Sequence, residues 1–126
     1  MSSTLDGAGQ IKMAALEDAQ MQLARVHSIV EHLAAAVRNA NNTSSFRMQL
    51  QRAATPLAGL LKPQFGMISA QITAMILISS RSGAEPMKVR ALRESVAQVR
   101  MQLEIAVTKV KERHAVAAPS ARSTES

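Results

Sequence analysis

Residues 16–37 read LEDAQMQLARVHSIVEHLAAAV, and residues 89–110 read VRALRESVAQVRMQLEIAVTKV. In both stretches apolar side chains recur at alternating steps of three and four residues, over about three heptads. This spacing places them on one stripe of an α-helix, as in long helices that pack on each other. The stretches therefore predict two long helices with apolar seams. The main seam residues are Leu16, Leu23, Val26, Val30, Leu33, Leu92, Val96, Val99, Leu103 and Val110.

The composition favours an all-α fold. Only 2 % of the 126 residues are aromatic, and the chain has no Tyr or Trp. A β-sandwich or barrel relies on aromatic and β-branched residues, so those folds are poor candidates. The eight methionines are expected mainly to fill gaps in a core, and a binding face that can repack is the alternative.

The order of elements follows from breaks in the apolar pattern. Gly-, Ser- and Asn-rich stretches separate periodic ones, which marks turns between helices. The two ends are polar or small and carry no apolar period. The expected order is a flexible arm at 1–9, a helical bundle domain at 10–114 with helices near 10–38, 45–80 and 86–114, and a disordered tail at 115–126.

The middle helix contains two prolines, Pro56 and Pro63. Each lacks a backbone N–H and clashes with the preceding turn, so each predicts a kink or a restart. Thr55 could cap a restart, with Pro56 at its first helical position. The segment is therefore expected to be one bent helix or two shorter ones.

The seams are long for a chain of this size. Burial of one Leu or Val is worth about 1.5–3 kcal/mol, and a three-helix monomer offers a small core. We therefore expect the bundle of three long helices to be completed by self-association. The pattern leaves open whether the first helix packs in its own chain or on a partner, because the same seam serves both.

Charge is unevenly distributed along the chain. Residues 1–45 hold three Lys or Arg and four Asp or Glu, whereas residues 46–126 hold twelve and five. A basic half suggests an anionic partner, and nucleic acid is one alternative. The basic face of the last helix would comprise Arg90, Arg93, Arg100, Lys109 and Arg113.

Residues that carry chemistry are sparse. The chain has no Cys, and its histidines are His27, His32 and His114. His27 and His32 are five apart, which does not place two imidazoles on one helix face as a metal pair requires. No carboxylate pair or Gly-rich phosphate loop is evident. We expect a protein that is not an enzyme and that has no metal, no cofactor and no small-molecule substrate.

Location is inferred from what the sequence lacks. The start MSSTLDGAGQ has no basic region followed by an apolar one, so no secretory signal is visible. The most apolar run, residues 67–80, is too short for a membrane span. Together with the absence of Cys, these features lead us to expect a cytoplasmic protein without a membrane span.

Residues 50–61 read LQRAATPLAGLL, and the run Thr55-Pro56-Leu57-Ala58 resembles the H-box of sensor histidine kinases. In that family a phosphoacceptor His precedes Thr-Pro-Leu by four positions on a dimerising helical hairpin. Here Gln51 holds that position and Arg52 replaces the acidic neighbour. The resemblance covers about 65 residues and implies the dimerisation scaffold without the phosphotransfer reaction.

The function expected from the sequence is therefore interaction. The leading hypothesis is an oligomeric adaptor or assembly component that acts through its apolar seams on itself and on another protein. The alternatives are a degenerate kinase-type dimerisation module that binds a signalling partner, and a nucleic-acid binder that uses the basic face.

Overall fold

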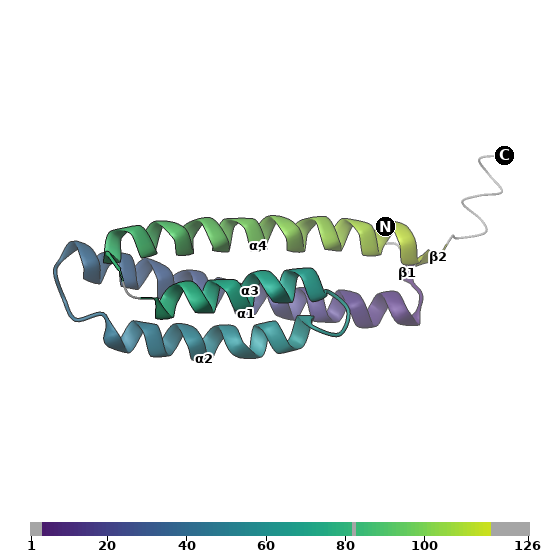
Figure 1. The fold of residues 1–126 in the computed structure, drawn as a ribbon. Helices are drawn as coiled ribbons and strands as arrows, with labels where there is room; N and C mark the ends of the chain where they lie inside the picture. Colours follow the sequence, from purple (N-terminus) through teal and green to yellow (C-terminus); the bar gives the residue numbers. More distant parts are fainter. Residues whose placement is uncertain (1–3, 82, 117–126) are drawn as a thin grey trace.

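The structure of the chain is a computed structural model that describes residues 4–81 and 83–116. Within these residues four helices, rather than the expected three, form an antiparallel bundle (Figure 1). The elements in chain order are β1 (Thr4–Leu5), α1 (Gly7–Arg38), α2 (Ser44–Leu61), α3 (Gly66–Ser80), α4 (Glu85–His114) and β2 (Ala115–Val116). The all-α prediction is confirmed.

Helix α1 begins at Gly7, three residues before the expected start, because Asp6 caps it. The Asp6 side chain accepts a hydrogen bond of 2.7 Å from the Gly9 backbone N–H. A capping carboxylate satisfies one of the N–H groups that a helix start leaves without an intrahelical acceptor. The helix ends at Arg38 as expected, and Ala40 follows with a φ of 55°.

The middle segment is two helices, and the break lies at Pro63 rather than Pro56. Helix α2 continues through Pro56, so Thr55 does not cap a restart. Tertiary packing explains this, since the α2 residues on either side of Pro56 share one buried stripe. After Leu61 the helix ends in the turn 62–65, which contains Pro63, and the chain reverses into α3.

The turn before α4 contains a glycine and is followed by a proline. Gly83 has a φ of 144°, a conformation that side chains rarely adopt. Pro86 then lies in the first turn of α4, where its missing N–H costs no hydrogen bond. Helix α4 ends at His114 as the sequence predicts.

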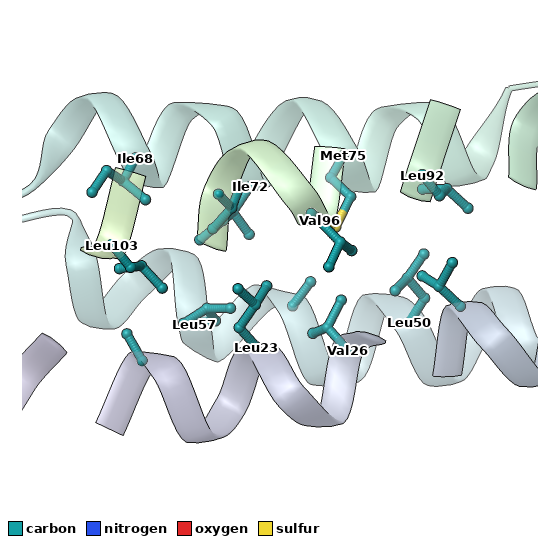
Figure 2. Close-up of a cluster of buried hydrophobic side chains, with 14 of the residues drawn as sticks. Leu23, Val26, Leu50, Leu57, Ile68, Ile72, Met75, Leu92, Val96 and Leu103 are labelled. Carbon is teal, nitrogen blue, oxygen red and sulfur yellow. The ribbon is translucent and has the colours of Figure 1, made fainter. Parts of the chain in front are cut away.

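One hydrophobic core joins the four helices. Helix α1 packs on α2 and α4, and α3 packs on the same two helices. Figure 2 shows side chains of all four helices in a single cluster, including Leu23 of α1, Leu57 of α2, Ile72 of α3 and Val96 of α4. A single chain therefore completes the four-helix core that we expected a second copy to complete.

The two ends of the described chain are joined. Strands β1 and β2 pair antiparallel, with Thr4 opposite Val116 and Leu5 opposite Ala115. The Asp6 backbone N–H also donates to the His114 carbonyl oxygen at 3.0 Å. Residues 1–3 and 117–126, which fall in the expected arm and tail, lie outside the described residues.

The helices differ greatly in length, and this difference shapes the surface. Helices α1 and α4 have 32 and 30 residues, and α2 and α3 have 18 and 15. At 1.5 Å per residue these are about 48, 45, 27 and 22 Å. Helices α1 and α4 therefore extend past the α2–α3 turn at the end that carries β1 and β2 (Figure 1).

Candidate functional site

The predicted seam residues all lie in the core of the single chain. Each of the ten is at most 4 % exposed. The first helix thus packs in its own chain, against α2 and α4. This corrects the expectation that the seams are a surface for a partner, since side chains buried within the chain cannot contact another protein unless the bundle opens.

The predicted basic face is divided between two sides of α4. Arg93 donates to Glu31 of α1 through Nε and a terminal nitrogen, at 2.9 and 2.7 Å. Arg100 lies 3.3 Å from His27 Nδ1, also on α1. Lys109 and Arg113 instead line a groove beside the start of α3. Arg90 is exposed near the start of α4. Because Arg93 and Arg100 face α1 while Lys109 and Arg113 face α3, the five predicted residues do not form one basic surface.

The Arg93–Glu31 pair is exposed but well aligned. The hydrogen bond from Arg93 lowers the pKa of the Glu31 carboxyl below its usual value of 4.5. The same bond raises the pKa of Arg93. A two-pronged guanidinium–carboxylate contact fixes geometry, whereas its stabilising effect at an exposed site stays small. The pair therefore orients α4 on α1.

The residues of the H-box resemblance are divided between the core, which holds Leu57, and the outside of α2. Gln51, Arg52 and Thr55 are all exposed. In the histidine-kinase family two hairpins from two chains complete the four-helix bundle, whereas here α1 and α4 of the same chain pack on α2 and α3. Any partner that contacts these positions would therefore meet a bundle whose four helices come from one chain.

A groove of about 400 Å³ lies where the short helices end. It is bounded by the α2–α3 turn and the first turn of α3 on one side, and by the last third of α4 on the other. Its apolar residues include Phe65, Ile68, Ile105 and Val110, and Met67 at its edge is 85 % exposed.

The polar residues of the groove are cationic or neutral. Lys12, Lys109, Arg113 and His114 line it, together with Gln64 and Gln102. None of the residues lining this groove carries a carboxylate. Glu104 and Glu112 line a neighbouring depression on α4, which shares Ile105 and Lys109 with the groove. The groove is therefore an apolar surface with a positive rim.

His114, at the end of α4, links the rim of the groove to the start of α1. Its Nδ1 lies 3.1 Å from an Asp6 carboxylate oxygen, and its Nε2 lies 3.2 Å from Lys12 Nζ. A neutral imidazole with its proton on Nδ1 satisfies both contacts. The bond from the Gly9 N–H lowers the pKa of Asp6 below its usual 3.8, and His114 adds to that effect.

Sequence reasoning missed this groove. It requires the chain to turn at Pro63, and only that turn brings Phe65 and Met67 beside the end of α4. One signal was present, because Ile105 and Met67 are apolar residues outside the heptad seams. Large apolar side chains that no seam accounts for are candidates for a surface contact.

Residues 4–81 and 83–116 contain no group of three or more His, Asp or Glu placed to hold a metal ion. No helix among them has the length and apolar character needed to cross a membrane.

No family model, no curated protein and no solved structure matches the chain.

Proposed function

We propose that the chain is a non-catalytic helical interaction protein, an adaptor or assembly component. One observation carries the proposal, namely that large apolar side chains remain on the surface although the core is complete. Among the described residues, those at least 41 % exposed on the helices are Ile11, Met21, Met48, Met67, Leu77, Met87, Met101 and Ile105.

The methionines support this proposal most directly. Of the eight, Met21, Met48, Met67, Met87 and Met101 are more than half exposed, and Met75 alone among those described is fully buried. The expectation that methionines mainly fill the core is therefore wrong. Methionine is flexible and polarizable, so exposed methionines suit surfaces that adapt to a partner.

Self-association remains a prediction, but the surface expected to form it is no longer the seams. The seams are occupied within one chain, so a dimer would have to use exposed apolar residues. A net charge of +6 works against contact between two copies. Light scattering coupled to size exclusion decides the question, with refractive-index detection because the chain lacks Trp and Tyr. A mass of one chain across the concentration series would rule self-association out.

A test of the proposal is photo-crosslinking in the cells that make the protein. A photoreactive amino acid replaces Met67 or Met101, both exposed and apolar, and Glu17, exposed and charged, serves as the matched control. We expect a discrete crosslinked protein from at least one methionine position and none from Glu17. Absence of any adduct at both methionine positions, in folded protein, would contradict the proposal.

A kinase-type signalling module is the second candidate. Its support is that Gln51, Arg52 and Thr55 share the solvent side of α2, where a response-regulator-like partner could reach them. Incubation with a phospho-donor partner distinguishes this candidate, which predicts a complex without phosphate transfer to Gln51. A nucleic-acid complex is weakened by the division of the basic residues, and it would have to dissociate steeply with salt.

A further inference from the structure

We propose that the groove at the end of the short helices binds one acidic amphipathic helix from another protein. This inference rests on the proposed function, because it names the surface and the chemistry of the partner. The argument combines the shape of the bundle, the apolar residues of the groove and the charge around it.

The shape leaves room for an added helix. Helices α2 and α3 end at the turn 62–65, while α1 and α4 continue as a two-helix layer (Figure 1). A bundle layer of two helices exposes the side that a third helix would cover. The groove lies where α2 and α3 stop and α1 and α4 continue. A partner helix bound there would lie along α4, in line with the hairpin of α2 and α3.

The apolar residues of the groove offer anchors at helical spacing. Ile105 lines the groove and is 41 % exposed. Met101, one turn earlier on α4, is 58 % exposed and lines the neighbouring depression, which shares Ile105 with the groove. Met67, at the start of α3, flanks the groove from the opposite side. An amphipathic helix binds such a groove by inserting apolar side chains spaced three and four residues apart.

The charge selects an acidic occupant. Lys12 comes from α1, and Lys109 and Arg113 come from α4, so cationic residues approach the groove from two helices. The Asp6 carboxylate, which contacts His114, already accepts a hydrogen bond from the Gly9 N–H. A partner rich in Glu or Asp therefore adds the charge that the groove lacks and associates faster at low salt.

Neither a second copy nor the end of this chain fits as well. A second copy carries the same net charge of +6 and would be repelled by the rim. Residues 117–126, AAPSARSTES, contain no large apolar side chain. Their charged residues are one Arg and one Glu. Neither of these two occupants offers the combination of an apolar stripe and negative charge that the groove complements.

The experiment uses a synthetic helix as the probe. The peptide has about 15 residues, with Leu at steps of three and four, Glu elsewhere and one Trp, a length that becomes helical on binding. Because the chain has neither Trp nor Tyr, the fluorescence comes from the peptide alone. A matched peptide carries Lys in place of every Glu. We expect saturable binding of the Glu peptide, weaker at high salt, and none of the Lys peptide.

Variants assign the binding to the groove. Lys109→Glu combined with Arg113→Glu replaces attraction with repulsion at two exposed positions and should weaken binding at least about tenfold. Ile105→Ser should weaken it through the lost apolar contact. The control is Lys111→Glu, a charge reversal at an exposed α4 residue that does not line the groove. Circular dichroism checks that each variant is folded.

Each possible outcome either supports the inference or overturns it. Loss of binding in the groove variants with retention in Lys111→Glu supports the inference. An equal loss in Lys111→Glu means general attraction to a basic protein and overturns it, as does equal binding of the Lys peptide or no binding of the Glu peptide. Photo-crosslinking from Met67 or Met101 tests for a partner without assuming an acidic helix. If the peptide experiment fails but a crosslinked protein is found, only the groove assignment is refuted.

Discussion

Gly9 of α1 lies so close to His114 at the end of α4 that a Cβ on Gly9 would overlap the His114 side chain. The same turn of α1 is capped by Asp6, which contacts both residues. The absence of a side chain at position 9 is therefore what allows the two ends of the bundle to meet.

Gly9→Ala should destabilise the protein by about 1–3 kcal/mol, because the added methyl displaces His114 and its contacts. Gly59→Ala is the matched control, since nothing lies within 4 Å of a Cβ at that helical position. Alanine is the better helix former, so the control should gain about 0.5–1 kcal/mol. Urea unfolding followed by circular dichroism measures both. A stabilised Gly9→Ala would show that the contact gives way freely.

Acid should destabilise the fold through Asp6 and Glu31. Their folded-state pKa values lie below the usual 3.8 and 4.5, so both carboxylates stabilise the native state in full above those values. This stabilisation is lost as the pH falls from about 4.5 through the lowered folded-state values. Carboxyl NMR titration checks the pKa values directly. The Asp6→Asn, Glu31→Gln double variant should show a flatter decline of stability with acid, and an unchanged slope would contradict this assignment.

Leu92→Gln and Met101→Gln separate core from surface on one helix. Leu92 is 0 % exposed, so the first variant buries an amide and should cost about 3 kcal/mol or more. Met101 is 58 % exposed, and its replacement should change the free energy of unfolding by no more than about 0.5 kcal/mol. Thermal unfolding of both variants measures the difference. Equal effects would mean that the heptad seam does not form the core.

Pro56→Ala should stabilise the protein, because Pro56 lies inside α2 and removes one helical hydrogen bond. The expected gain is about 1–3 kcal/mol in the free energy of unfolding. Pro63→Ala is the comparison, since Pro63 lies in the turn between α2 and α3. There the loss of proline increases the freedom of the unfolded chain and should cost up to about 1 kcal/mol. The two changes should therefore have opposite signs in denaturant melts.

The candidate site divides into parts that could and could not be anticipated. Arg93 and Arg100 could be placed on the exposed side of the last helix, but their partners Glu31 and His27 lie 62 and 73 positions away in sequence. Lys109 and Arg113 belong to a groove whose other wall is Phe65 and Met67. Helical periodicity places residues on a face of their own helix and carries no information about which helix lies opposite.

The sequence by itself determined the local structure. The heptads of residues 16–37 and 89–110, the turn before α4 and the all-α class depend on residues within a few positions of each other, so they can be read directly. Only the tertiary structure decided that Pro63 ends a helix while Pro56 does not, and that the seams close within one chain. Those outcomes depend on burial, because an apolar stripe gains the same free energy against its own chain as against a copy. The lengths of α2 and α3, set by the turn at Pro63, let one chain complete the core and left the groove open beside α4.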